Sequence, residues 1–402
     1  MAWTRSAGSA TRAEGWREAL AQELADLDAQ SLRRRVVTPA SGQGPRIEID
    51  GATLLNFTSN NYLGLATDAR LIEGAVEATR RYGTSVSASR LLAGSTPLHD
   101  ALERRLAALK GCAAALLFSA GYLANLGVLT ALAGPDAEVF SDELNHASII
   151  DGCRLARARA SVYRHRDLAH LEQLLAASEA ARRLIVTESV FSMDGDLAPL
   201  PELFALAERH GALVVLDEAH ATGVFGEGGT GALSHFGIDP AGLAVPLVVV
   251  GTLSKALGSV GGFVAADETV IAYLLNRARS FIFSTALPPA TVGAAHAALD
   301  VIEAEPERGA LALALAARLR DGLAAAGWST GPSASQIVPV LLGEAEAALT
   351  MERELRAAGV FAKAIRPPTV PLGSSRLRLN VMATHDESDV DRVIAAAGRA
   401  DG

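Results

Sequence analysis

Residues 200–220, LPELFALAERHGALVVLDEAH, contain one complete helix-to-strand unit. The first half, Leu200–His210, has Pro201 near its start and Gly211 directly after it, which are typical helix start and stop signals. The second half, Ala212–Leu216, is a short apolar run that predicts a fully buried strand. Three similar runs occur elsewhere: Ala113–Phe118, Leu184–Thr187 and Pro246–Val250. Continuously apolar strands are typical of parallel sheets covered on both faces.

Ala-rich stretches with helical character separate these strands, for example Leu98–Leu109 and Leu168–Ser178. Strands that alternate with helices predict an α/β fold, with a mainly parallel central sheet and helices on both faces. From Leu287 onward the alternation weakens, which suggests a smaller α+β unit. Its expected elements are long helices to about Ala326, a strand at Gln336–Leu342, a helix at Ala345–Ala358 and a strand at Arg376–Val381.

We therefore expect three parts. Residues 55–286 form a large α/β domain, and residues 287–402 form a small C-terminal α+β domain. Residues 1–54 begin with a charged helix and form an extension that packs on the small domain.

The composition excludes several classes of protein. Of the 402 residues, 50% are apolar, which is too many for a disordered chain. The net charge of −9 argues against nucleic acid as a partner, because no basic face is evident. The two cysteines have no spacing that suggests a disulfide framework or a structural zinc site, so we expect no metal and a reducing cytoplasm. The first 35 residues have no apolar segment of the kind found in a secretory signal.

The mean hydropathy of +0.24 raises the possibility of a membrane segment. Residues 112–135 contain no charge over 24 positions, which is long enough to span a bilayer. However, Ser119, Asn125 and Thr130 interrupt the run, and three glycines punctuate it. A buried strand, a turn and a buried helix explain the segment better, and we expect no membrane association.

Lysine is scarce in this chain. Of 36 basic residues only Lys110, Lys255 and Lys363 are lysines, so 33 are arginines. Lysine can lose its proton and form a Schiff base with a carbonyl, which arginine cannot do. Lys255 follows the strand at 246–250 within GTLSKALG, in a loop where α/β sheets bind ligands. The alternative is an ordinary solvated loop lysine.

An acidic motif, Asp217–His220 (DEAH), follows the strand at 212–216. A carboxylate at the exit of a buried strand needs a cationic partner, and a pyridinium nitrogen would serve, while His220 could bond a ring substituent. Nucleotide-driven helicases share these letters, but they need a Gly-Lys phosphate loop that this chain lacks. Asp217 could also simply cap a turn.

Ser119–Tyr122 (SAGY) connects a predicted strand to a helix, so the helix N-terminus offers an anion site at the edge of the sheet. Thr252 and Ser254 could help to hold a phosphate near Lys255, and His146 could stack on an aromatic ring or be merely structural. Residues 226–231 match a dinucleotide motif in letters only, and we interpret them as a mobile glycine loop. A Schiff-base lysine, a pyridinium carboxylate and a phosphate cradle together predict pyridoxal 5'-phosphate as cofactor.

At this point the sequence resembles a known family over nearly its whole length, the α-oxoamine synthases, which are fold-type I pyridoxal phosphate enzymes. The resemblance rests on Asn60–Leu65 (NNYLGL), Ser119–Tyr122, Glu188–Asp196 (ESVFSMDGD), Asp217–His220 and Gly251–Lys255 (GTLSK). Two further motifs, Arg366–Pro371 (RPPTVP) and Arg376–Arg378 (RLR), are most similar to the branch that acts in biotin biosynthesis.

The resemblance implies a role for each matching residue. Lys255, Asp217 and His146 would be the catalytic residues, with Lys255 bound to the cofactor, Asp217 on its ring nitrogen and His146 stacked on its ring. The remaining cofactor contacts would be Gly121, Tyr122, Ser192, His220 and Thr252, with Ser284 and Thr285 reaching the phosphate of a neighbouring subunit. Asn60 and Arg378 would bind the amino-acid carboxylate, His146 would also face substrate, and Arg33 and Thr369 would contact substrate.

The same resemblance implies the reaction, a decarboxylating Claisen condensation of L-alanine with a pimeloyl thioester by a cytoplasmic homodimer. Coenzyme A or an acyl carrier protein would carry the pimeloyl group. Two alternatives stay open: another α-oxoamine synthase that joins glycine to an acetyl thioester, and a catalytically silent subunit that keeps the fold. A silent subunit would be expected to lose the lysine, and Lys255 is present.

Overall fold

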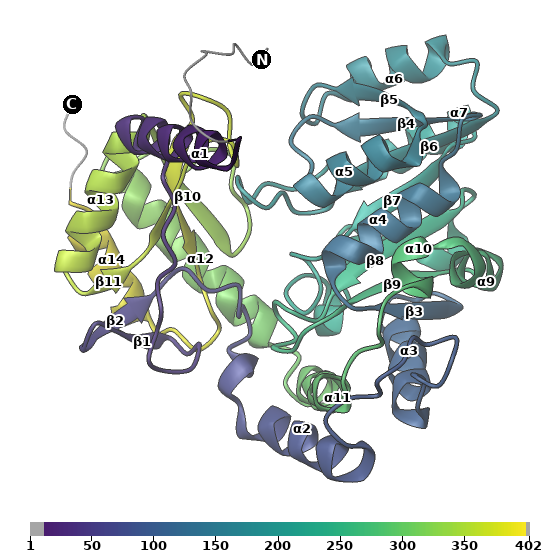
Figure 1. Ribbon diagram of the computed structural model, residues 1–402, viewed down its shortest axis with the longest axis horizontal. Coiled ribbons are helices and arrows are strands. Elements are labelled where there is room, and N and C mark those ends of the chain that lie inside the picture. The colour runs from purple at the N-terminus through teal and green to yellow at the C-terminus, as the bar shows by residue number, and fades with distance from the viewer. Residues whose placement is uncertain (1–11, 399–402) are drawn as a thin grey trace.

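The computed structural model describes residues 12–398, and its centre is a seven-stranded sheet with the order β3-β9-β8-β7-β6-β4-β5 (Figure 1). The strands are β3 (Ala114–Phe118), β4 (Ala137–Asp142), β5 (Arg159–Tyr163), β6 (Arg182–Glu188), β7 (Leu213–Asp217), β8 (Leu247–Thr252) and β9 (Gly262–Ala266). β4 to β8 pair in parallel, and β9 runs antiparallel to both β8 and β3. The carboxyl ends of all strands except β9 therefore lie at one edge.

Helices cover both faces of this sheet. The core cluster on one face includes α4 (Gly121–Leu132), α5 (Ala147–Ala156), α9 (Glu268–Arg277) and α10 (Arg279–Ile282). The cluster on the other face includes α3 (Pro97–Leu109), α6 (Leu168–Ala177), α7 (Leu200–His210) and α8 (Ala232–His235). Alternate strand residues enter opposite clusters, as Val248 and Val249 do, so the central strands are buried on both faces and are largely apolar. The predicted α/β architecture is confirmed.

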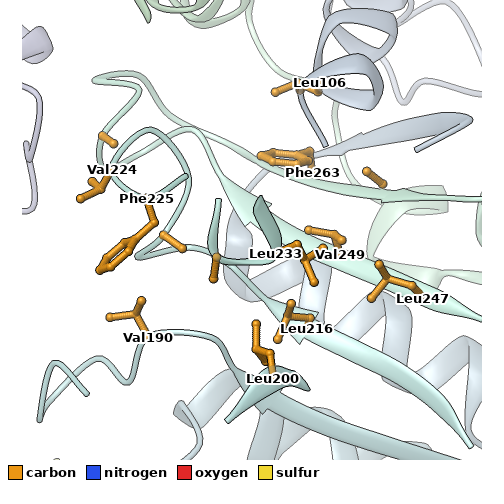
Figure 2. Close-up of a cluster of buried hydrophobic side chains, with 14 of the residues drawn as sticks. Leu106, Val190, Leu200, Leu216, Val224, Phe225, Leu233, Leu247, Val249 and Phe263 are labelled. Carbon is orange, nitrogen blue, oxygen red and sulfur yellow. The ribbon is translucent and has the colours of Figure 1, made fainter. Parts of the chain in front are cut away.

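Figure 2 shows part of the cluster on the α7 side, where Leu200, Leu216, Val249 and Phe263 converge. Phe263 comes from the antiparallel strand β9 and is fully buried. A Cβ at Gly251 would lie 2.3 Å from its ring, so β8 needs glycine here, next to the loop that carries Lys255. Three short 3-10 turns lie at Leu65–Thr67, Glu227–Gly229 and Pro240–Gly242.

Two small sheets lie beside the large one (Figure 1). One has the order β10-β13-β12, and the other has the order β1-β2-β11. Their strands are β1 (Arg46–Ile49), β2 (Ala52–Asn56), β10 (Ile337–Gly343), β11 (Val360–Phe361), β12 (Lys363–Ile365) and β13 (Ser375–Asn380). The associated helices are α1 (Arg12–Ala29), α12 (Arg308–Ala325), α13 (Ala345–Ala357) and α14 (Glu387–Ala397). The N-terminal strand β2 thus pairs with the C-terminal strand β11.

Helices α2 (Ala69–Tyr82) and α11 (Pro289–Ala304) cross closely (Figure 1). A Cβ at Gly74 would lie 2.8 Å from the carbonyl oxygen of Gly293, so glycine permits this contact. Buried side chains of α11 belong to the same core cluster as α7, whereas those of α12 belong to the cluster of the small sheets. The domain boundaries at 54 and 286 stay predictions.

The four predicted strands of the large sheet lie within two residues of β3, β6, β7 and β8, and Leu200–His210 matches α7. The uncharged run 112–135 forms β3, a turn and the twelve-residue helix α4. Within residues 12–398 no helix is both long and apolar enough to cross a bilayer.

Candidate active site

Five strand ends meet around one cavity of about 260 Å³. The turn after β3, the turn after β4, the last residue of β6, and the turns after β7 and β8 all contribute to its wall. The lining residues are Ala120, Gly121, Tyr122, Asn125, His146, Ser148, Glu188, Asp217, Ala219, Val250, Gly251, Thr252, Ser254 and Lys255. Ligands of α/β proteins bind at this edge of the sheet.

Lys255 lies in this wall at the end of β8. Its Nζ is 2.8 Å from Nε2 of His220, and burial lowers the pKa of Lys255 to about 8, although the nearby acidic groups Asp217 and Glu188 act in the opposite direction. An amine with a pKa near neutrality can be deprotonated and attack a carbonyl at physiological pH.

Behind Lys255 a chain of hydrogen bonds fixes His220. Its Nδ1 is 2.7 Å from the hydroxyl of Tyr62, which donates to Oδ1 of Asn60 at 3.0 Å and accepts from Nη2 of Arg378 at 3.3 Å. Because the hydroxyl proton goes to Asn60, we assign the imidazole proton to Nδ1, which leaves Nε2 free to accept from Lys255. Burial, reinforced by the nearby charges of Lys255 and Arg378, lowers the pKa of His220 well below its usual range, so the ring is neutral.

Asp217 is buried at the end of β7 and has two hydrogen-bond partners. Nδ2 of Asn125 donates to its Oδ2 at 2.6 Å, and the backbone N–H of Ala219 donates to its Oδ1 at 2.8 Å. Asn125 projects from α4 and also donates to the hydroxyl of Ser148 at 3.0 Å. Among residues 12–398 no cationic side chain is bonded to this carboxylate, so it is suited to a cationic ring nitrogen.

His146 precedes α5 and caps its N-terminus, since its Nδ1 is 3.2 Å from the N–H of Ser148 and 2.8 Å from the hydroxyl. Its ring lies edge-on to Tyr122, with 6.4 Å between ring centroids. Burial lowers the pKa of His146, which favours a neutral aromatic ring on the cavity wall.

The N-terminus of α4 forms another part of the wall. The helix begins at Gly121, where a Cβ would lie 3.2 Å from Cβ of Thr252. The hydroxyl of Thr252 is 2.7 Å from that of Ser254. Backbone N–H groups and hydroxyls at a helix N-terminus suit a phosphate. Together with Lys255, Asp217 and His146, these residues fit pyridoxal 5'-phosphate.

Most of the predicted cofactor residues line this cavity, but several predicted site residues lie outside its wall. His220 contacts Lys255 from behind, and Ser192 offers its backbone oxygen to Nε of Arg378 at 2.6 Å. Nη1 of Arg378 donates to Oδ1 of Asn60 at 3.0 Å, so these two predicted carboxylate ligands are neighbours. Ser284 and Thr285 line a separate small cavity.

Arg33 and Thr369 line a different cavity of about 410 Å³ between the segment after α1 and strand β12. Arg33 is paired with Asp28 at 2.8 Å, and the arginine that reaches Thr369 is Arg34, whose Nη2 is 3.4 Å from the threonine hydroxyl. Arg366 donates to the backbone oxygens of Ser31 and Arg33 and holds the segment in place.

The glycine-rich segment 226–231, predicted to be a mobile loop, is hydrogen-bonded to buried residues in the structure. Oε1 of Glu218 accepts the N–H of Ala232 at 2.7 Å, and Nζ of Lys110 donates to the carbonyl of Thr230 at 2.6 Å. Glu218 and Lys110 are themselves paired at 2.6 Å in the interior, so the segment is fixed to the turn that carries Asp217.

Sequence reasoning did not assign site roles to Tyr62, Asn125, Ser148 and Glu188. Asn125 gave a signal, because it is a polar residue in an apolar helix, but nothing in the sequence indicated its partner. Glu188 and Tyr62 lie in motifs that were noted as family features only. Their roles depend on contacts between segments far apart in the chain.

Comparison with known proteins defines the class. The Aminotransferase class I and II family profile matches residues 52–396, so the chain belongs to this family, and its cofactor is pyridoxal phosphate. A solved serine palmitoyltransferase that holds this cofactor superposes with a TM-score of 0.88 at 32% identity, covering 96% of this chain and 98% of that one.

More specific relatives share one name. The 8-amino-7-oxononanoate synthase of Geobacter sulfurreducens is 53% identical over 384 residues, which cover 94% of this chain and 97% of the relative. A crystal structure of 8-amino-7-oxononanoate synthase from Francisella tularensis has a TM-score of 0.74 at 27% identity, covering 86% of this chain and 96% of that one. The predicted fold type and the predicted resemblance to the α-oxoamine synthases are confirmed.

Proposed function

We propose that this chain condenses L-alanine with a pimeloyl thioester and releases CO2, giving 8-amino-7-oxononanoate and a free thiol. The observation that carries the proposal is the adjacency of two groups, Lys255 in the cofactor cavity and the Arg378–Asn60 pair, linked through His220 and Tyr62. The name shared by relatives at about half identity supports the choice of substrates.

Pyridoxal phosphate, when bound, supplies an electron sink for the carbanion formed at the α-carbon of alanine. Gly121, Thr252 and Ser254 would hold its phosphate, and Asp217 would stabilise its protonated ring nitrogen. His146 would lie against its ring.

Arg378 would bind the carboxylate of alanine. Its guanidinium is fixed by Ser192 on Nε and by Asn60 on Nη1, which leaves N–H groups for a substrate carboxylate. Fixing the carboxylate orients the α-carbon toward Lys255. The carboxyl group lost as CO2 is the one that derives from alanine, so Arg378 must release it after the carbon–carbon bond has formed.

Lys255 would remove the α-proton of alanine and later return a proton. With a pKa of about 8, a substantial fraction of the amine is neutral near pH 7.5, and it can act as a general base. His220, which accepts from Nζ with its Nε2, would keep the lysine side chain oriented between these two steps.

The acyl donor would approach from the side of the small sheets. A cavity of about 520 Å³ lies next to His146, between Leu144 and Ile150 on one side and residues 367–372 on the other. The neighbouring 410 Å³ cavity, which Arg33, Arg34, Arg35, Lys363 and Arg366 help to line, is rich in cations and suits the phosphate groups of a coenzyme A or phosphopantetheine carrier. Thr369 lies in both walls.

We further propose a cytoplasmic homodimer. Thr285 and the nearby Phe283 are exposed, and Phe283 is 70% accessible, which leaves a large apolar side chain for a second subunit to cover. Ser284 and Thr285 would reach the cofactor phosphate of the second subunit. Cys112 and Cys153 are free thiols in the structure, which suits a reducing compartment.

Two measurements test the function. Lys255→Ala in the purified protein should abolish both the absorbance band of the bound cofactor and turnover, and retention of both would exclude the assigned role. The wild-type protein should consume L-alanine with pimeloyl thioesters, carried by coenzyme A or by acyl carrier protein, but not with acetyl or succinyl thioesters. Turnover with glycine and acetyl-CoA instead would indicate a glycine acetyltransferase, and no turnover with any pair would indicate a silent subunit.

A further inference from the structure

A second carboxyl group lies in the cofactor cavity, and the mechanism above does not use it. Glu188 is the last residue of β6, is 2% exposed and lines the same wall as Lys255. Its backbone is opposite Asp217 in the parallel pairing of β6 and β7. Side chains in register on neighbouring strands project to the same face about 5 Å apart, so the two carboxyl groups are neighbours.

The two carboxyl groups differ in their partners. Both oxygens of Asp217 accept hydrogen bonds, from Asn125 and from the N–H of Ala219. In contrast, Oε1 of Glu188 is buried and has no hydrogen-bond partner among the described residues. A buried polar atom without a partner is costly, and a carboxyl group that lines a ligand cavity can obtain a partner from the ligand.

The position of Glu188 is firmly held. Its backbone N–H donates to Oδ1 of Asn145 at 3.1 Å, and Asn145 in turn donates to the carbonyl of Val186 at 2.8 Å. The N–H of the next residue, Ser189, donates to the carbonyl of Asp217 at 2.8 Å. The backbone at this strand end is therefore fixed on both sides, which places the Cα of Glu188 at the cavity wall.

The charges facing Glu188 decide its protonation. Asp217 lies beside it, Lys255 lines the same cavity, and His146 lies on the turn before α5. Burial and the charge of Asp217 outweigh the attraction of Lys255 and raise the pKa of Glu188 to about 8. Two neighbouring carboxyl groups in a buried site do not both ionise, because like charges repel. Glu188 therefore carries a proton at neutral pH.

We propose that Glu188 is a further cofactor-contacting residue, a neutral carboxylic acid that donates a hydrogen bond to pyridoxal phosphate. In this arrangement one negative charge balances the ring nitrogen, and the second carboxyl group serves as a hydrogen-bond donor. The proposal concerns the cofactor alone, so it stands or fails independently of the identity of the acyl donor.

The test compares three variants by their dissociation constants for pyridoxal phosphate, measured by equilibrium dialysis of apoprotein. Glu188→Gln keeps the shape and a donor but cannot ionise, and its affinity should stay within about threefold of wild type. Glu188→Ala removes the donor and should bind the cofactor roughly tenfold more weakly, as expected for the loss of one hydrogen bond at a buried site.

The matched control is Glu138→Gln. Glu138 is also buried in the large sheet, near the start of β4, but its oxygens are occupied by Ser161 and by Ser178 at 2.6 Å, and it does not line the cavity. Its cofactor affinity should equal that of wild type. If Glu188→Gln loses as much affinity as Glu188→Ala, the residue acts as a carboxylate and the proposal is wrong. If Glu188→Ala binds normally, the residue does not contact the cofactor.

An infrared measurement covers the case in which Glu188→Ala does not fold. The wild-type holoprotein at pH 7 should show the carbonyl absorption of a protonated carboxylic acid that is missing in Glu188→Gln and unchanged in Glu138→Gln. Identical spectra in this region for wild type and Glu188→Gln would overturn the proposal.

Discussion

Substitution of Lys110 by methionine should strongly destabilise the protein, although Lys110 does not line the cofactor cavity. The side chains of Lys110 and Glu218 are each 1% exposed, and their charged atoms are 2.6 Å apart. At an effective dielectric constant of about 20, the attraction over that distance is about 6 kcal/mol. Methionine would fill the space but leave the Glu218 carboxylate buried without its cation.

Part of this loss is compensated. Oε1 of Glu218 still accepts the N–H groups of Ala232 and Leu233, at 2.7 and 3.3 Å. The expected decrease in the free energy of unfolding is therefore about 3–5 kcal/mol, the range for a buried pair that loses one partner. The double variant Lys110→Met/Glu218→Gln should recover part of the loss, because the uncompensated charge is gone.

The assay is urea unfolding at pH 7, followed by circular dichroism. The matched control is Lys363→Met, because Lys363 also pairs with a glutamate, Glu352, but is 34% exposed. The control should lose less than about 1 kcal/mol. A loss of less than about 1 kcal/mol for Lys110→Met would refute the reasoning, and so would a double variant that is less stable than the single one.

Three further outcomes are expected. His165 is clamped between Asp142 and Asp196, both at 2.9 Å, and the hydrogen bonds outweigh burial and raise its pKa from 6.5 to about 9. The protonated ring should contribute about 3 kcal/mol to the free energy of unfolding, fully below pH 6.5, and this contribution should disappear as the pH rises through 9. The free energies of unfolding of wild type and His165→Asn, measured in urea, should therefore differ at pH 6 and converge at pH 10. Arg378→Lys should raise the KM for alanine at least roughly tenfold while cofactor affinity is kept, because lysine cannot bind a carboxylate with two parallel hydrogen bonds. Phe263→Ala should lower the unfolding free energy by about 3–5 kcal/mol, and a loss below about 1 kcal/mol would mean that the core refills the space.

The sequence was sufficient to locate the centre of the site. Asp217 and Lys255 each follow an apolar strand, and parallel strands bring their carboxyl ends together, so local patterns predicted a long-range arrangement. The antiparallel strand β9 was not predicted, because its five residues, GFVAA, look like any short apolar segment. The direction of a strand within a sheet depends on the strands with which it pairs, and the composition of the strand does not identify them.

Contacts between distant segments were the other limit. Arg34 contacts Thr369, which lies 335 positions later in the chain, whereas Arg33 contacts Asp28. The conformation of the turn after α1 determines which of the two arginines faces Thr369. Similarly, Tyr62 was part of a quoted motif, but its bond to His220 requires the turn after β2 to reach the end of β7. In an irregular segment, periodicity does not show which of two adjacent residues makes a given contact.

The pairing of β2 with β11 has a consequence for synthesis of the chain. Leu55 is opposite Val360, so the N-terminal strands emerge from the ribosome roughly 300 residues before their partner. At ordinary rates of translation this delay is on the order of 15–60 seconds. All seven strands of the large sheet are complete by Ala266, so that sheet can form during the delay, while the β1–β2 pair still lacks β11 on the free edge of β2. Completion of this small sheet is thus a late event, and the exposed edge of β2 must be protected until the chain has been made at least as far as β11.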